Sequence, residues 1–320
     1  MLPRLLVVLS ILLQLVGSTY FTGSERSQNG IRLMTFNIWQ SGKNVENGQQ
    51  KIAKHILMVN PDIVALQETY ANVTKNLTMM LGHPWVAVER NHEYPDTAIL
   101  TRHVIVPNTN LSTSGGVGVK IMLRTGYMVH FWSLHLDYTS YGPYAANNKL
   151  VNRIDQIMAG ENTEYGRGPQ INEILSLPTM KKWMEKSDDV PIFIAGDFNG
   201  PSHLDWTEQT KNIHGDWVVR WPATKELEDR GFTDTYREIY PNVLTNPGIT
   251  WSTVNKFNPE WNYTIPEPQD RIDFLFYKGP VVADQIMAYS GCEKPQRIPF
   301  HEHNDYPSDH FAVFADYTFI

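Results

Sequence analysis

The stretch Ile192-Phe193-Ile194-Ala195-Gly196-Asp197-Phe198-Asn199 joins an apolar run to a polar turn. Pro191 introduces it, and a short, fully apolar run bounded in this way is typical of a central strand buried on both faces. Residues just beyond such a strand stand at the edge of a sheet, where a rigid scaffold meets a variable loop. The stretch therefore predicts a buried strand that places Asp197 and Asn199 at one edge of a sheet.

Strands and helices alternate along the rest of the chain. Further strands are expected at residues 31–39, 63–67, 97–101, 117–123, 127–136, 272–277, 281–289 and 311–319. Apolar residues at helical spacing predict a helix before Pro61, and the proline stops it. The middle of the chain is also expected to be helical, with helices over residues 147–158 and 171–186 that flank a polar loop at 162–170. No repeat or composition break interrupts this pattern, so we expect one domain of two packed sheets with helices outside.

Several of the predicted strands deliver residues that carry chemistry. Asn37 lies near the end of the first strand, Glu68 follows the second, and His135 ends a hairpin strand. Asp197 and Asn199 are two residues apart, so on a strand pleat they would point the same way and reach one substrate oxygen together. We therefore expect these side chains to gather at one edge.

Five short motifs follow one another along the chain: Phe36-Asn37-Ile38-Trp39, Pro61-Asp62-Ile63-Val64-Ala65-Leu66-Gln67-Glu68-Thr69, Ala195-Gly196-Asp197-Phe198-Asn199, Arg271-Ile272-Asp273-Phe274 and Pro307-Ser308-Asp309-His310. In order and spread they resemble the motifs of the endonuclease/exonuclease/phosphatase family, and the resemblance covers residues 31–320. It implies the DNase I-like fold, an α/β (α+β) four-layer sandwich of two mainly antiparallel sheets flanked by helices. It also implies metal-dependent hydrolysis of phosphate esters.

Hard oxygen donors are present among the predicted site residues. The carboxylates of Glu68 and Asp309 and the amide of Asn37 suit Mg²⁺ or Mn²⁺, and no Cys/His cluster with zinc spacing accompanies them in the sequence. Glu68 is the predicted principal metal ligand. By the resemblance, Asn37 and Asp309 complete or support the metal site.

A histidine and two aspartates are predicted to handle protons. The imidazole of His310 titrates near neutral pH, so it suits a general base that takes a proton from the attacking water. The resemblance implies that Asp273 orients His310, that Asp197 protonates the leaving oxygen or positions the attacking group, and that Asn199 donates to a phosphoryl oxygen. The division of proton transfer between Asp197 and His310 stays open. His135 stands where DNase-like and sphingomyelinase-like members carry a phosphate-binding histidine, whereas apurinic endonucleases have a tyrosine.

Composition and charge bear on the substrate. The net charge is -7, with 27 Lys plus Arg against 34 Asp plus Glu, and no Lys/Arg run is present. A polynucleotide-binding protein usually has a basic face, so charge favours a small phosphate ester or a lipid headgroup. Nucleic acid is not excluded, because a bound dication would supply positive charge. Tyr138 is expected to line the pocket and bind substrate, and with Tyr141 and Tyr144 it forms an aromatic loop suited to a base, an acyl group or a sugar.

The first residues predict export. Arg4, an apolar run of about a dozen residues and small residues at 16–18 are typical of a signal peptide, and the run is too short to span a bilayer. We expect a signal peptide at 1–18, a short N-terminal extension at 19–30 and a catalytic domain at 31–320. Sequons at Asn72, Asn76, Asn110 and Asn262 predict glycosylated surface loops. The expected location is extracellular, or the lumen of the secretory or lysosomal pathway, with no transmembrane anchor.

The sequence therefore predicts a secreted, Mg²⁺- or Mn²⁺-dependent phosphoric ester hydrolase in which a metal- and His-activated water attacks phosphorus. Phosphodiesters are expected ahead of phosphomonoesters, and a monomer is the expected form. Two alternatives are a secreted DNase I-like nuclease and a sphingomyelinase-like lipid phosphodiesterase. A catalytically inactive binding protein on the same fold is the least favoured reading, because the acidic, amide and histidine residues of all five motifs are intact.

Overall fold

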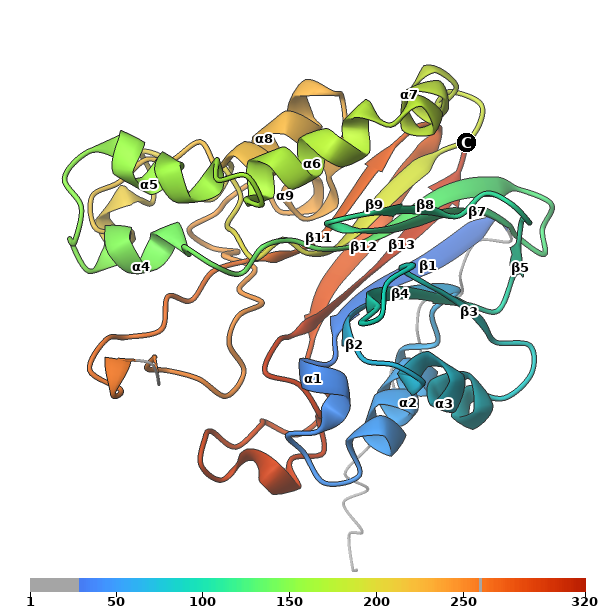
Figure 1. The fold of residues 1–320 in the computed structure, drawn as a ribbon, viewed down its shortest axis with the longest axis horizontal. Helices are drawn as coiled ribbons and strands as arrows, with labels where there is room; N and C mark the ends of the chain where they lie inside the picture. Colours follow the sequence, from blue (N-terminus) through green and yellow to red (C-terminus); the bar gives the residue numbers. More distant parts are fainter. Residues whose placement is uncertain (1–28, 259–260) are drawn as a thin grey trace, which may run out of the picture.

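In the computed structural model, which describes residues 29–258 and 261–320, two β-sheets pack face to face between layers of helices (Figure 1). The first sheet consists, in spatial order, of β12 (Val281–Tyr289), β13 (Ala312–Phe319), β1 (Gly30–Asn37), β2 (Ile63–Thr69), β4 (Asp96–Thr101) and β3 (Val86–Glu89). The second consists of β10 (Thr233–Asp234), β11 (Asp273–Lys278), β9 (Ile192–Asp197), β8 (Met128–His135), β7 (Gly116–Met122) and β5 (Val104–Ile105), with β6 (Leu111–Thr113) also paired to β7.

The two sheets are mainly antiparallel, as expected. Each has one parallel pair, β1 with β2 and β8 with β9, and the other pairs of the described strands are antiparallel. Parallel neighbours end at the same edge, whereas an antiparallel neighbour begins there. The edge at which β1, β2, β8 and β9 end therefore also receives the first residues of β4, β11 and β13.

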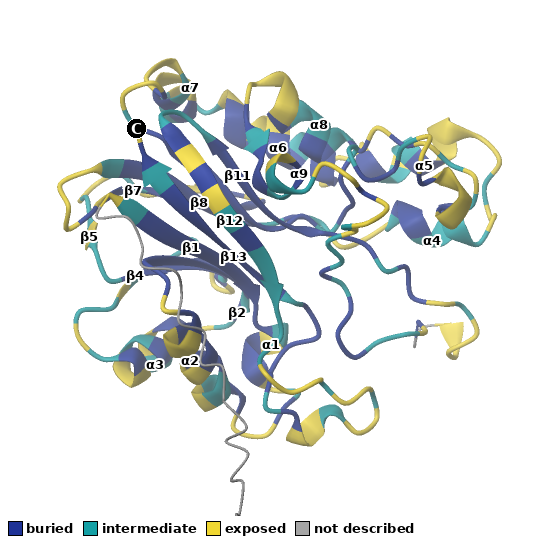
Figure 2. Ribbon diagram, turned by 180° about the vertical axis from the view of Figure 1, so that it is seen from behind, coloured by how far each residue is buried: buried dark blue, intermediate teal, exposed yellow. Residues whose placement is uncertain are grey.

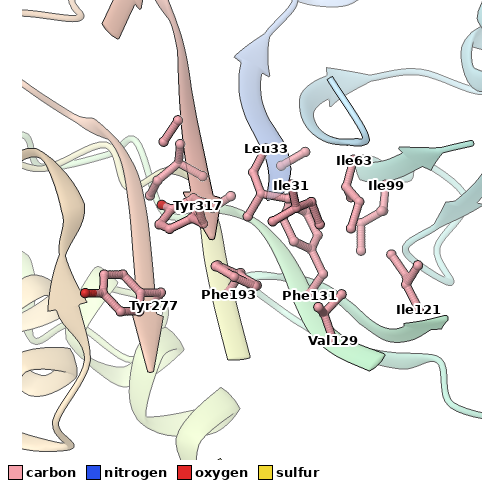
Figure 3. Close-up of a cluster of buried hydrophobic side chains, with 14 of the residues drawn as sticks. Ile31, Leu33, Ile63, Ile99, Ile121, Val129, Phe131, Phe193, Tyr277 and Tyr317 are labelled. Carbon is pink, nitrogen blue, oxygen red and sulfur yellow. The ribbon is translucent and has the colours of Figure 1, made fainter. Parts of the chain in front are cut away.

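Apolar side chains from both sheets fill the space between them (Figure 3). Side chains alternate across a strand, so Ile31 and Leu33 of β1 point into this inter-sheet core, where Phe131 and Phe193 of the second sheet also lie. Met34, on the opposite face of β1, packs toward the helices instead. Each such buried side chain contributes roughly 1.5–3 kcal/mol, so this core fixes how the two sheets align.

Helices cover the outer faces of both sheets and complete the four layers. Apolar residues of α2 (Gly48–Val59) and α3 (Val73–Leu81) cluster with the outer face of the first sheet. Those of α6 (Arg167–Ser176), α7 (Pro178–Glu185) and α8 (Pro222–Asp229) cluster with the second. Figure 2 shows the result, with mostly buried strands between helices whose outward faces are exposed, whereas the edge strand β12 alternates buried and exposed residues. The remaining helices are α1 (Trp39–Gly42), α4 (Gly142–Asn147), α5 (Ile154–Glu161), α9 (Thr235–Ile239) and the short 3-10 turns η1 (Lys211–Ile213) and η3 (His301–His303).

Two expected helices are each divided. Residues 147–158 contribute to α4 and α5 rather than forming one helix, and the chain leaves the helical conformation after Asn148. Residues 171–186 contribute to α6 and α7, because Leu177 precedes a proline and adopts φ -56° and ψ 133°. The loop expected at 162–170 is also shorter, since α6 begins at Arg167, whose guanidinium pairs with the buried Glu161.

The predicted signal peptide at 1–18 and nearly all of the extension at 19–30 lie outside the described residues. Within residues 29–258 and 261–320, no helix is both long and apolar enough to cross a bilayer. Three of the sequon asparagines, Asn72, Asn110 and Asn262, are exposed. Asn76 differs from the expected loop position, because it lies half-buried within α3 and its Nδ2 donates to Gln49 Oε1 at 3.1 Å.

Candidate active site

A cavity of about 1150 Å³ opens at the edge where the central strands end. Its walls include five of the predicted site residues, which lie in the last residues of a strand, just beyond a strand or just before β13: Glu68, His135, Asn199, Asp309 and His310. Three others lie beneath the cavity and are at most 1 % exposed: Asn37, Asp197 and Asp273. Tyr138 also lines the cavity, although 74 % of it is exposed.

Strand register explains why residues so far apart in sequence meet. The parallel pairing of β8 with β9 sets His135 opposite Asp197, and the antiparallel pairing of β9 with β11 sets Asp197 opposite Asp273. Gly196 is needed for this register because its φ is 157° and a Cβ there would lie 2.1 Å from the carbonyl oxygen of Leu134. The second sheet thus places three titratable side chains on adjacent strands.

Asp197 lies at the centre of the group. Its Oδ2 lies 2.9 Å from Asn37 Nδ2, 3.7 Å from His135 Nε2 and 3.6 Å from His310 Nε2. Its Oδ1 accepts the backbone N–H of Asn199 at 2.8 Å. One carboxylate oxygen is therefore held by the turn, and the other lies between two imidazoles.

The expectation that Asp197 and Asn199 share one face of a pleat is wrong. β9 ends at Asp197, and Asn199 has φ 47°, so the chain turns between the two residues instead of staying extended. The Nδ2 of Asn199 donates to the carbonyl oxygen of Leu136 at 2.9 Å. Asn199 still lines the cavity, but through a turn rather than through strand geometry.

His310 is held by Asp273, as the resemblance implied it would be. Its Nδ1 lies 2.9 Å from Asp273 Oδ2, and Thr250 Oγ1 accepts the backbone N–H of Asp273 at 3.0 Å. Burial disfavours a charged imidazole, but the carboxylates of Asp273 and Asp197 outweigh burial and hold the pKa of His310 well above its usual range. Burial, partly offset by His310, raises the pKa of Asp273 to about 6. In the metal-free protein the two carboxylates therefore favour the protonated ring of His310.

His135 has a partner that the sequence did not indicate. Its Nδ1 lies 3.0 Å from both carboxylate oxygens of Asp96. Burial opposes charge on this ring, but Asp96, Asp197 and Glu68 outweigh burial and raise the pKa of His135 to about 9. Asp96 begins β4, and the antiparallel pairing of β4 with β2 brings that strand start opposite Thr69. Asp96 precedes the apolar part of its strand, so the pattern of an apolar run followed by a polar residue does not indicate it.

The His135 ring is expected to titrate near pH 9 in the metal-free protein, and Asp96→Asn should lower this pKa by more than about one unit, since burial then dominates. A folded-state pKa above the ordinary 6.5 stabilises the fold below that pH, and the stabilisation is lost as pH rises through 9. NMR titration of the ring and urea unfolding at about pH 6 and pH 10 measure both effects. The exposed Asp188→Asn is the matched control; a ring that titrates identically in all three proteins contradicts the assignment to Asp96.

Glu68 and Asp309 fit a divalent cation. Glu68 lies at a β-bulge with φ 61°, which turns its carboxylate away from the pleat toward the cavity. Asp309 is 5 % exposed, and its Oδ1 has no hydrogen-bond partner among the described residues. Burial first, and then the charge of Glu68, raise the pKa of Asp309 well above its usual range. A buried carboxylate oxygen without a donor, close to a second carboxylate, is the arrangement that a bound cation would stabilise.

Asn37 bridges carboxylates in this structure. Its Nδ2 donates to Glu68 Oε1 at 3.1 Å and to Asp197 Oδ2 at 2.9 Å, while its Oδ1 accepts the backbone N–H of Trp39 at 3.0 Å. The amide oxygen expected at the metal is thus occupied by Trp39. Asn37 positions Glu68 and Asp197, and its ligation of a metal stays a prediction.

A second group of potential ligands lies deeper. Asp197, Asp273 and His310 each offer one atom, and these atoms lie within 4.8 Å of one another. Asp273 already bonds His310, and Asp197 already bonds Asn37 and Asn199. A catalytic cation has to contact substrate, and Glu68 and Asp309 line the cavity, so they are the better site.

Other residues support the site without having been expected. Arg271, 3 % exposed, bonds both Asp205 and Asp234 and so fixes the chain just before Asp273. Trp251 packs its ring 4.7 Å from that of His310. A buried arginine two residues before a site aspartate was a usable signal, whereas Trp251 lies in a loop that only the tertiary fold brings to the site.

Comparison with known proteins places the chain in a family. Residues 34–310 match the Endonuclease/Exonuclease/phosphatase family. Uncharacterized protein F14F9.5 of Caenorhabditis elegans is 82 % identical over 316 residues, which cover 99 % of this chain and 100 % of that protein. D. rerio TDP2, solved with a single-strand DNA product, shares the fold with a TM-score of 0.58 and 17 % identity, covering 90 % of this chain and 99 % of TDP2. An endonuclease/exonuclease/phosphatase family protein from Bacteroides thetaiotaomicron has a TM-score of 0.58 and 14 % identity, covering 92 % of this chain and 97 % of its own. This chain therefore belongs to the endonuclease/exonuclease/phosphatase family of metal-dependent phosphoric ester hydrolases.

Proposed function

We propose that the protein is a divalent-metal-dependent phosphodiesterase, with phosphomonoesters as poorer substrates. The observation that carries this proposal is the position of Asp197 Oδ2, within 3.7 Å of His135 Nε2 and 3.6 Å of His310 Nε2 at the base of the cavity. A phosphoryl group above these atoms would meet two imidazolium donors and one carboxylate acceptor. This is the set of groups that water attack on phosphorus requires.

The carboxylates around His135 and His310 raise the pKa of both rings in the metal-free protein, which favours both rings as proton donors. His135 donates to a phosphoryl oxygen and neutralises charge that develops there. Asp197 Oδ2 takes the proton of the attacking water as the new P–O bond forms. His310 then gives its Nε2 proton to the leaving oxygen as the old P–O bond breaks. Asp273 holds the ring in place for this transfer. The proposal thus reverses the expectation that His310 is the general base.

The remaining predicted residues bind and position. Asn199 uses one amide hydrogen on Leu136 and has a second for a phosphoryl oxygen. Glu68 and Asp309 would hold the cation, which when bound polarises a phosphoryl oxygen as a Lewis acid. Their hard oxygen atoms favour Mg²⁺, with Mn²⁺ as the substitute.

Two chromogenic esters test the proposal. Purified protein is expected to hydrolyse bis(p-nitrophenyl) phosphate at least about tenfold faster than p-nitrophenyl phosphate in Mg²⁺ or Mn²⁺, because the second negative charge of the monoester would lie beside Glu68 and Asp309 in a cavity whose described walls hold no lysine or arginine. Excess EDTA should abolish both reactions. Turnover would also exclude an inactive binding protein, and no turnover of either ester with metal would overturn the proposal.

A nuclease is the second candidate, supported by the fold shared with TDP2, which was solved with a single-strand DNA product. Against it, the described walls of the cavity include no lysine or arginine to neutralise neighbouring phosphates. Plasmid nicking and oligonucleotide digestion, with a Glu68→Gln preparation as blank, decide between the two.

We also propose that the enzyme enters the secretory pathway. The exposed positions of Asn72, Asn110 and Asn262 suit glycan attachment, whereas Asn76 is the least accessible of the four. Protein recovered from the medium of eukaryotic cells should lose mass on endoglycosidase treatment. Protein retained in the cytosol without glycans would contradict the proposal.

A further inference from the structure

A turn with left-handed backbone lies beside Glu68 at the cavity wall. The turn is α1, whose residues Trp39, Gln40, Ser41 and Gly42 have φ values of 42°, 52°, 64° and 73°. Glycine adopts such values without a steric cost, whereas other residues do so at a cost and usually singly. Three successive non-glycine residues in this conformation therefore need contacts that offset their strain.

The turn makes three hydrogen bonds to the chain around Glu68. The backbone N–H of Gln40 donates to Glu68 Oε2 at 2.5 Å. The hydroxyl of Ser41 donates to the carbonyl oxygen of Glu68 at 2.9 Å and accepts the backbone N–H of Tyr70 at 2.8 Å. Ser41 thus bonds the two peptide groups on either side of Thr69, directly after the predicted metal ligand.

Glu68 needs such support because its own backbone is also left-handed. Its φ is 61°, at the bulge where the register between β2 and β4 shifts. A bulge interrupts the regular ladder of backbone hydrogen bonds, so the partners for this part of the chain have to come from elsewhere. If the chain relaxed to an extended strand, the Glu68 carboxylate would follow the pleat and leave the cavity wall.

The hydroxyl of Ser41 acts at a distance from the cavity. Ser41 is 1 % exposed, and it is not among the described residues that line the cavity. Its hydroxyl therefore has no access to a substrate or a cation. A glycine would adopt a φ of 64° more easily, so it is the hydroxyl, and not the backbone conformation, that explains a serine at this position.

We propose that Ser41 is a positioning residue for the metal site, because its two hydrogen bonds hold Glu68 in the conformation that directs the carboxylate into the cavity. This inference rests on the proposed phosphodiesterase function and assigns control of metal affinity to a residue outside the cavity. Ser41 handles no proton of the reaction. Its loss should weaken metal binding and leave the chemical step intact once metal is bound.

Ser41→Gly tests this role. The substitution removes the hydroxyl and suits a φ of 64°, so weaker metal binding would not come from added backbone strain. Titration calorimetry with Mn²⁺ is expected to give a Kd about tenfold or more above the wild-type value. At saturating Mg²⁺, kcat for bis(p-nitrophenyl) phosphate should stay within about threefold of wild type. Ser41→Ala, which removes the hydroxyl without the added flexibility of glycine, should also bind Mn²⁺ about tenfold or more weakly.

A second measurement needs neither metal nor substrate. The Tyr70 amide donates to Ser41, so in the metal-free protein its hydrogen exchange should become about tenfold or more faster in both variants. Ser187→Ala is the matched control, because Ser187 is 3 % exposed, donates to the carbonyl oxygen of Met184 at 2.8 Å and lies between α7 and β9. This control should keep the wild-type Mn²⁺ affinity and the wild-type exchange rate at Tyr70. Urea unfolding compares the stabilities of the three variants.

The outcomes separate the two proposals. Folded Ser41→Gly and Ser41→Ala proteins with wild-type Mn²⁺ affinity would overturn the role of Ser41 and leave the phosphodiesterase proposal standing. Equal weakening in Ser187→Ala would also overturn it, since the effect would then follow from general destabilisation. A wild-type protein that hydrolyses no ester would refute the phosphodiesterase proposal alone, and the Mn²⁺ titrations would still decide the role of Ser41. No binding of Mn²⁺ by the wild-type protein would overturn both.

Discussion

Glu68→Gln is expected to lower kcat/KM for bis(p-nitrophenyl) phosphate by about 10³-fold or more, because it removes the charge that holds the cation at the cavity wall. The substitution keeps the shape of the side chain and an oxygen that can accept from Asn37 or from the backbone N–H of Gln40. The loss should therefore come from metal binding and not from collapse of the bulge. Titration calorimetry with Mn²⁺ should show weaker binding, and activity should partly return at high metal concentration.

Two controls make this result specific. Glu185→Gln removes the same charge from the exposed surface of α7 and should bind metal and hydrolyse the ester as the wild-type protein does. Circular dichroism and urea unfolding check that Glu68→Gln is folded. A folded Glu68→Gln protein with wild-type activity at low Mg²⁺ would show that Glu68 is not a metal ligand.

The parts of the fold that the sequence predicts best are the strands buried on both faces. The run at Ile192–Asp197 is a central strand because nothing polar interrupts it before Gly196, and parallel pairing with β8 and antiparallel pairing with β11 bury it completely. A strand of this kind leaves a local trace in the sequence. The short strands β5, β6 and β10 leave none, since each is two or three residues long.

The site residues divide along similar lines. Three of them lie in the last residues of strands: Glu68, His135 and Asp197. Each follows an apolar run, and that pattern is visible in the sequence. Asp96 begins a strand, and it reaches the same edge only because β4 runs antiparallel to β2. Trp251 lies in a long loop with no periodicity and packs against His310 only in the folded chain. Pairing direction and loop path depend on the whole fold, so local sequence does not reveal these last two.

The proton roles could not be assigned from sequence for a related reason. An isolated imidazole titrates near neutral pH, which made His310 a candidate general base. In the fold, two carboxylates from different strands surround it, and they hold its pKa well above that range. Charge on a side chain is set by its neighbours in space, and here those neighbours are 37 residues and more away in sequence.

His310→Ala is expected to reduce kcat by about 10⁴-fold for a diester with an alkoxide leaving group, since the variant has no acid for that oxygen. A p-nitrophenolate leaves without protonation, so its diester should lose only about 10²-fold, the part due to phosphoryl binding. Asp197→Asn should behave differently. Every substrate needs the proton of water removed, so its loss should be similar for both leaving groups.

The comparison of leaving groups therefore shows which residue takes the proton of the attacking water and which residue protonates the leaving oxygen. It uses methyl p-nitrophenyl phosphate and a dialkyl phosphate, measured in Mg²⁺ for the wild-type, His310→Ala and Asp197→Asn proteins. Asp273→Asn, which keeps a side chain beside His310 Nδ1 but removes its charge, should show the same leaving-group dependence as His310→Ala, because it acts through the same ring. If His310→Ala were insensitive to the leaving group while Asp197→Asn were strongly sensitive, the roles would be exchanged and His310 would be the base after all. The distances of 3.6 and 3.7 Å from Asp197 Oδ2 to the two imidazoles allow either direction of proton flow, and the raised pKa of both rings is what favours the one proposed.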